Sequence, residues 1–72
     1  MEEKRNLYFE RSNGELILLA NNIDKTEVYK EINNFLDAHN YKSYYTREWE
    51  DNGVRHYDVG SHTEFFLWTN KF

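Results

Sequence analysis

Apolar and polar residues follow a helical period in one stretch of this chain, residues 24–40. Polar side chains occupy one side of that stretch, and apolar side chains recur on the other, at Val28, Ile32, Phe35 and Leu36. Asp24 and Glu27 have the spacing of a capping box, in which each side chain accepts a hydrogen bond from the backbone N–H of the other. At the far end, Asn40 can adopt the left-handed conformation that ends a helix, and His39 suits the negative pole of the helix dipole. The pattern predicts an amphipathic helix, with His39 as a cap rather than a catalyst.

Two apolar-rich runs, residues 6–11 and 15–20, flank a first Asn-Gly pair, and we expect them to form a β-hairpin. Asn13-Gly14 is the preferred pair for a two-residue type I′ turn, because both central positions need a positive φ. This turn places Phe9 opposite Leu18, so that the face expected to meet the helix carries Leu7, Phe9, Leu16, Leu18 and Ala20. The other face leaves three apolar residues that need cover from the C-terminal tail, a second copy of the chain or a partner, namely Tyr8, Ile17 and Leu19.

A second Asn-Gly pair, Asn52-Gly53, joins residues 41–50 to residues 54–59 in a second expected hairpin. The inner face of this hairpin is expected to carry Tyr44, Thr46, Glu48, Tyr57 and Val59. The outer face carries the most site-like cluster of the chain, in which an Arg–Asp pair lies beside a stacked Trp and His: Tyr45, Arg47, Trp49, His56 and Asp58. This cluster is either a solvated face of cross-strand pairs or a protein-binding surface, since recognition hot spots use exposed aromatic and Arg side chains.

The tail allows two interpretations. Gly60 favours a bend, and residues 61–64 have the form of another capping box, which would begin a short helix. Four bulky residues in succession, Phe65 to Trp68, fit a buried strand better, and we predict a strand that extends the sheet or covers the first hairpin. Residues 1–5 and 69–72 are expected to be frayed.

These elements predict a single α+β domain over residues 1–72. Two antiparallel hairpins flank one amphipathic helix in the order β-β-α-β-β, with a possible short fifth strand, and the helix packs on one face of the sheet. A chain of 72 residues has room for one domain and buries only about 60% of its unfolded surface, so we expect modest stability. Aromatic residues, 18% of the chain, compensate by burying large areas or serve a partner.

The composition of the chain argues against several classes of protein. The chain has no cysteine and no apolar N-terminal run, so we expect no disulfide, no thiolate metal site, no signal peptide and no membrane span, with the cytoplasm as the default compartment. The net charge of −4 argues against nucleic-acid binding as the main role, because nucleic-acid binders usually gather Lys and Arg.

Motifs that carry chemistry are nearly absent. His56, Asp58 and His62 are metal-ligand types within seven residues, but no further ligand is expected to converge with them. Asp58, Ser61 and His62 are the residue types of a hydrolytic triad, yet neighbours in sequence rarely reach triad geometry on a strand. The acidic residues Glu48, Glu50 and Asp51 are interpreted as a solubilising edge. We therefore expect no catalytic residue, no metal and no cofactor.

Residues 58–68 read D-V-G-S-H-T-E-F-F-L-W, and an E-D-N-G turn precedes them. In these two motifs the chain resembles a group of small proteins encoded by phages and prophages of Gram-positive bacteria. The resemblance covers the last third of the chain specifically and the rest in outline. It implies a small accessory protein made in an infected cell, where such chains commonly bind and redirect or block a host protein.

Three functional hypotheses follow. The first is a non-enzymatic protein-interaction module that uses the outer cluster, or that self-associates into a homodimer through Tyr8, Ile17 and Leu19. The alternative is a single-stranded nucleic-acid binder in which Tyr and Trp side chains stack on bases, although only a few basic residues lie near the sheet. The third is a small metal-dependent enzyme.

Overall fold

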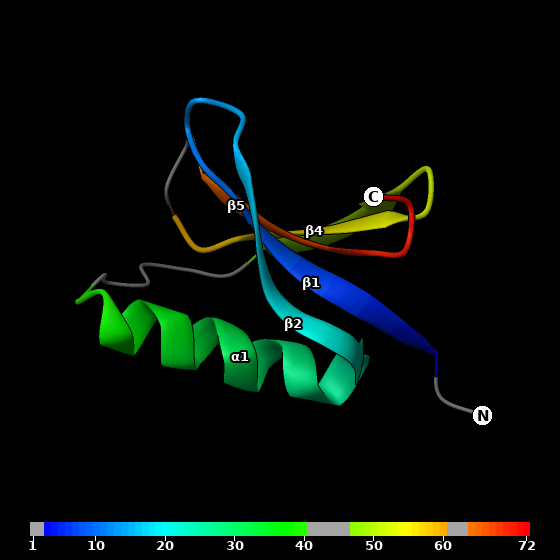
Figure 1. Cartoon of the computed structure of the whole chain (residues 1–72), viewed down its shortest axis with the longest axis horizontal. Helices are drawn as coiled ribbons and strands as arrows, with labels where there is room; N and C mark the ends of the chain where they lie inside the picture. Colours follow the sequence, from blue (N-terminus) through cyan, green and yellow to red (C-terminus); the bar gives the residue numbers. More distant parts are fainter. Residues whose placement is uncertain (1–2, 41–46, 61–63) are drawn as a thin grey trace.

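A five-stranded antiparallel sheet and one helix make up the described part of the protein, in a computed structural model that describes residues 3–40, 47–60 and 64–72. Along the chain the elements are β1 (Lys4–Glu10), β2 (Leu16–Asp24), α1 (Lys25–Ala38), β3 (Arg47–Asp51), β4 (Val54–Asp58) and β5 (Phe65–Thr69). The strand order across the sheet is β2-β1-β5-β4-β3, and α1 lies on one side of the sheet (Figure 1). The predicted α+β class is confirmed, with a full fifth strand in the order β-β-α-β-β-β. Tyr44, Tyr45, Thr46, Ser61 and His62 lie outside the described residues.

The helix begins and ends where its sequence predicts. The Asp24 carboxylate accepts a hydrogen bond of 3.0 Å from the backbone N–H of Glu27, and it also accepts the Thr26 hydroxyl. Asn40 has a φ of 57°, the left-handed conformation expected after the last turn, and His39 is the C-cap. The buried side of the helix carries Val28, Ile32 and Leu36, with Phe35 partly buried beside them.

The second hairpin has the predicted register. Arg47 lies opposite Asp58, and Trp49 lies opposite His56. Asn52 and Gly53 both have positive φ, 54° and 77°, as a type I′ turn requires.

The first hairpin differs from its prediction. Of its two turn residues only Gly14 has a positive φ, 88°. Gly14 donates its N–H to the Arg11 carbonyl at 2.9 Å, and Arg11 donates its own N–H to the Glu15 carbonyl at 2.8 Å, which closes a three-residue loop. The Asn13 side chain accepts the Glu15 N–H at 2.9 Å, a local bond that stabilises this loop over the two-residue turn.

The longer loop shifts the register by one residue and exchanges the faces of residues 16–19 in β2. Phe9 lies opposite Ile17, not Leu18, and Tyr8 lies opposite Leu18, not Leu19. Ile17 and Leu19 therefore lie on the helix side, where they line a hollow with Phe9 and Phe35. A bulge after Leu18 restores the expected side for Ala20, which pairs with Leu7. The predicted face set of Tyr8, Ile17 and Leu19 is thus wrong, and the apolar residues that share the outer face with Tyr8 are Leu16 and Leu18.

The tail forms the central strand of the sheet. β5 lies between β1 and β4 and so joins the two hairpins, which confirms the predicted strand and gives its place. Phe66 and Trp68 point to the helix side, where the core consists of Leu7, Phe9, Ile23, Val28, Ile32, Leu36, Tyr57, Val59, Phe66 and Trp68. Thr69 is fully buried opposite Asn6, and Lys4 and Arg5 belong to β1, so these residues are held rather than frayed.

Candidate functional site

The sheet face opposite α1 carries one continuous row of side chains that crosses all five strands. Successive strand registers place one residue of each strand in this outer row, in the order Trp49, His56, Leu67, Tyr8 and Leu18. Leu67 in the middle is buried, whereas Trp49 and Leu18 at the two ends are 40% and 53% exposed. The outer row is therefore filled at its centre and open at both ends.

Trp49 is held in a fixed orientation at the β3 end of the outer row. Its indole stacks on the His56 ring with centroids 5.1 Å apart and an interplanar angle of 8°, and it meets the edge of Phe65 at 6.3 Å. This is the stacked pair that the second hairpin was expected to present. A large exposed aromatic side chain with a rigid neighbour on either side loses little conformational freedom when a partner covers it.

Arg47 lies beside Trp49, and its guanidinium group is bound by the buried carboxylate of Asp58. One of its guanidinium nitrogens lies 2.8 Å from an Asp58 carboxylate oxygen, and the guanidinium carbon lies 5.9 Å from the Trp49 ring centroid. Asp58 is only 1% exposed, and its other oxygen accepts the Gly60 N–H at 2.9 Å. The Arg47 side chain is 63% exposed. The predicted outer cluster therefore forms for its four described members, except that Asp58 is a buried anchor and not a surface residue.

The C-terminal end of the chain adds to the outer face. The Tyr8 hydroxyl donates to the Phe72 carbonyl at 3.4 Å, and the two rings meet edge to face with centroids 5.5 Å apart. Phe72 is more than half exposed. The tail thus covers part of Tyr8 and leaves another apolar ring open to solvent.

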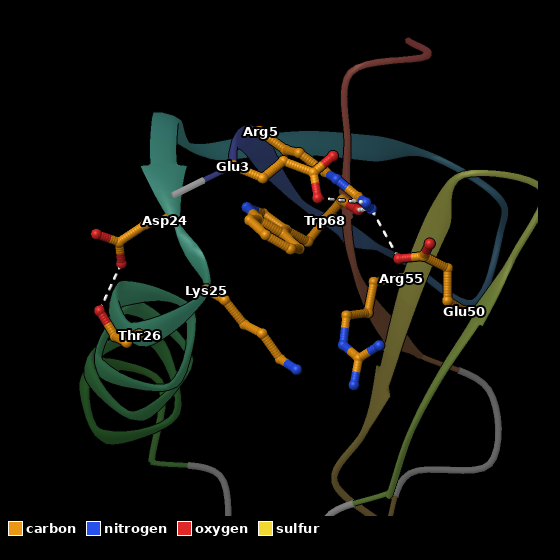
Figure 2. A pocket seen from close by; sticks show the side chains of 8 residues that line it. All are labelled: Glu3, Arg5, Asp24, Lys25, Thr26, Glu50, Arg55 and Trp68. Atoms are coloured by element: carbon orange, nitrogen blue, oxygen red, sulfur yellow. Dashed lines mark hydrogen bonds and ion pairs between the residues drawn. The ribbon is translucent and has the colours of Figure 1, made fainter. Parts of the chain in front are cut away.

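A second candidate site is a cavity of about 340 Å³ on the helix side of the sheet. Figure 2 shows it between the start of α1 and the β3–β4 hairpin, with the Trp68 indole at its back and the Lys25 and Arg55 side chains extending into it from opposite sides. Its lining combines acidic and basic groups with one indole: Glu3, Arg5, Asp24, Lys25, Thr26, Glu50, Arg55 and Trp68.

Arg5 closes one side of this cavity, and two carboxylates accept hydrogen bonds from its guanidinium group. Its guanidinium donates to Glu3 at 2.9 Å and to Glu50 at 3.0 Å, and it lies 4.6 Å from the centroid of the Trp68 ring (Figure 2). The hydrogen bond with Arg5 lowers the pKa of Glu3, and the bond with Glu3 in turn raises the pKa of Arg5. Sequence reasoning missed this residue because nothing within residues 1–5 signals burial. The arrangement is a clasp that ties β1 to the β3–β4 hairpin.

Glu48 is the acidic counterpart of this clasp on the inner face of β3. Burial opposes its ionisation, but hydrogen bonds from Tyr29 and Arg55 outweigh that effect and lower the pKa of Glu48. The Arg55 guanidinium lies 2.9 Å from the Glu48 carboxylate. Burial and the bond to Glu48 raise the pKa of Tyr29 to about 12. Glu48 therefore joins α1 to the second hairpin, although it lies on an exposed strand, as expected for the acidic edge.

The described residues contain no group of three or more His, Asp and Glu side chains placed to hold a metal. Asp58, one of the three metal-ligand types noted in the sequence, is committed to Arg47 and to the Gly60 N–H. In the ranges that the structure describes, α1 is too short and too polar to cross a membrane.

No family model matches the chain, and no curated protein and no solved structure matches it significantly. The fold defines the class: a small α+β domain in which, among the described residues, one helix packs on one face of a five-stranded antiparallel sheet and the other face exposes Trp49 and Leu18 at its two ends.

Proposed function

We propose that this protein is a non-catalytic protein-binding module and that Arg47, Trp49 and His56 form the centre of its contact surface. The observation that carries the proposal is the exposed, oriented indole of Trp49 beside an Arg side chain fixed by a buried carboxylate. Trp and Arg are among the residues that most often carry the energy of protein interfaces.

A rough magnitude supports this choice of surface. An indole offers up to about 250 Å² for burial, so the exposed 40% of Trp49 corresponds to roughly 100 Å². Covering that area contributes about 2.5 kcal/mol at about 25 cal/mol per Å², which is the size of an interface hot spot. The neighbouring Arg47 favours a partner with an acidic side chain or free carbonyl groups next to an apolar pocket.

The resemblance of the tail to phage and prophage proteins favours a bacterial host protein as the partner. Immobilised protein would be incubated with a bacterial lysate, and captured proteins identified by mass spectrometry. Trp49→Ala and Arg47→Ala are expected to lose the captured partner, whereas Lys30→Ala on the exposed side of α1 retains it. Capture that is undiminished in both outer-face variants, with folding verified by circular dichroism, would exclude this surface.

Single-stranded nucleic acid is a second candidate partner, because Trp49 and Tyr8 lie on one open sheet face and sheet-borne aromatic rings can stack on bases. The net charge of −4 opposes it. Tryptophan fluorescence separates the two ideas, since Trp49 is exposed and Trp68 is buried, so a stacked base would quench Trp49. Fluorescence that stays unchanged at tens of micromolar oligonucleotide, roughly the weak end of non-specific binding at low salt, would dispose of this candidate.

A further inference from the structure

β2 lies at one edge of the sheet, and the first part of this strand is apolar and uncharged. In the described sheet it pairs with β1 alone. Three consecutive residues near its start, Leu16, Ile17 and Leu18, are 40%, 38% and 53% exposed, so both faces of the strand are open there. Residues 16–22 contain no charge and no proline, the two devices with which proteins usually protect an edge strand from pairing.

The hydrogen-bond pattern of the first hairpin shows which backbone groups remain at this edge. Arg11 donates its N–H to the Glu15 carbonyl, so these two residues occupy a bonded position of the ladder, although the Glu15 N–H goes to the Asn13 side chain. Such pairs alternate with non-bonded pairs along an antiparallel ladder. The register then makes Ile17 a bonded partner of Phe9, and it turns the N–H and C=O groups of Leu16 and Leu18 toward the free edge.

The opposite edge of the sheet lacks these properties. β3 reads Arg-Glu-Trp-Glu-Asp, and an antiparallel copy centred on Trp49 would set Glu48 against Glu50. Like charges placed opposite each other destabilise a strand pair. A copy of β2 centred on Ile17 instead sets Leu16 against Leu18 and creates no like-charge contact. The two edges therefore differ in a way that favours self-pairing at β2.

We propose that two copies of this chain pair through the start of β2 about a two-fold axis at Ile17, which joins the two sheets into one. Leu16 and Leu18 of opposite copies exchange backbone hydrogen bonds, and their side chains meet on the outer face. The two Ile17 side chains meet on the helix side. This isologous arrangement satisfies the free N–H and C=O groups of both copies at once.

The pairing is confined to this short segment. The register of β1 and β2 shifts after Leu18 and again before Ile23, and Asn22 has a φ of 56° with its N–H bonded to the Asn6 side chain. Such bulges bend a strand away from a straight partner. The interface is consequently small, and the expected dimer is weak and dependent on concentration.

The proposal goes beyond the partner-binding function, because Trp49 and the edge of β2 lie at opposite ends of the outer row. Sedimentation of the whole protein over a concentration series up to about 1 mM should show a shift from the 8.9 kDa monomer to twice that mass. Leu18→Lys should abolish the shift, and Leu18→Pro should do the same because it removes an N–H that faces the free edge. Phe72→Lys, which replaces another exposed apolar residue, should leave it unchanged.

Cysteine cross-linking tests the geometry itself, since the natural chain has no cysteine. Facing Ile17 residues form a non-bonded pair with Cα atoms about 4.5 Å apart, within the range for a disulfide, whereas the two Leu18 residues are offset along the strands. Ile17→Cys should therefore form a disulfide dimer at least tenfold faster than Leu18→Cys under mild oxidation. Equal rates in the two variants, or a wild-type protein that stays monomeric throughout the concentration series, would overturn the proposal.

Discussion

The exposed guanidinium of Arg47 on β3 pairs with the buried carboxylate of Asp58 on the neighbouring strand β4, with a nitrogen–oxygen distance of 2.8 Å. The pair connects the interior of the protein to its candidate contact surface, because the same Arg side chain lies beside the Trp49 ring. A side chain anchored in this way is part of the fold and part of the surface at once. Its removal should affect both.

Replacing Arg47 by Ala should lower the free energy of unfolding by about 1–2 kcal/mol, because Asp58 stays buried while it loses a charge-assisted hydrogen bond. Urea denaturation measures the change. Arg47→Lys should recover part of the loss, and Arg47→Ala combined with Asp58→Asn should cost less than the sum of the single changes. Additive losses would indicate that the two residues do not stabilise each other.

Arg5→Met should destabilise the protein by about 1–3 kcal/mol, because the guanidinium bonds and the cation–π contact with Trp68 are lost together. Lys4→Met is the matched control, since Lys4 is the exposed neighbour on the same strand. Thermal melts followed by near-ultraviolet circular dichroism report both stability and the environment of Trp68. If Arg5→Met were as stable as Lys4→Met, the contacts of Arg5 would make no net contribution to the free energy of unfolding.

Glu48 should make the protein sensitive to acid. Its folded-state pKa lies below the usual value of 4.5, so the stability it contributes is present above pH 4.5 and is lost as the pH falls through the lower folded-state pKa. Chemical denaturation at a series of pH values should show a smaller decrease in Glu48→Gln than in the natural protein across this range. A pH profile that Glu48→Gln leaves unchanged would contradict the role assigned to Glu48.

The two Asn-Gly turns should respond differently to the same substitution. Asn52 has a positive φ, which glycine adopts freely, so Asn52→Gly should change stability by less than about 0.5 kcal/mol. Asn13 instead accepts a hydrogen bond from Glu15, and Asn13→Gly should cost about 1 kcal/mol. Urea denaturation of the two variants measures this difference. Equal effects would argue that both hairpins use the same turn.

The structure of the second hairpin and the helix could be predicted because their determinants are local. A capping Asp, a 3.6-residue apolar period and a two-residue turn each act within a few residues, and the Trp49–His56 and Arg47–Asp58 pairs follow from the turn alone. The outer cluster was therefore visible in the sequence. The burial of Asp58 was not, since it depends on residues elsewhere in the chain.

The same local reasoning failed at the first hairpin, where a bond from the Glu15 N–H to the Asn13 side chain stabilises a longer loop and residues 16–19 of β2 change faces. Tertiary structure decided the rest. β5 takes the central position because it can pair with β1 on one side and β4 on the other, and no signal within residues 65–69 specifies those partners. Arg5 is buried for the same reason: Glu50 and Trp68, more than forty positions away along the chain, come together around it only when the sheet is complete.

The sequence by itself determined the helix, the turns' positions and the α+β class, because short-range hydrogen bonds and periodicity encode them. Strand order, the inner clasp and the free edge of β2 arise from long-range pairing, which no local pattern encodes.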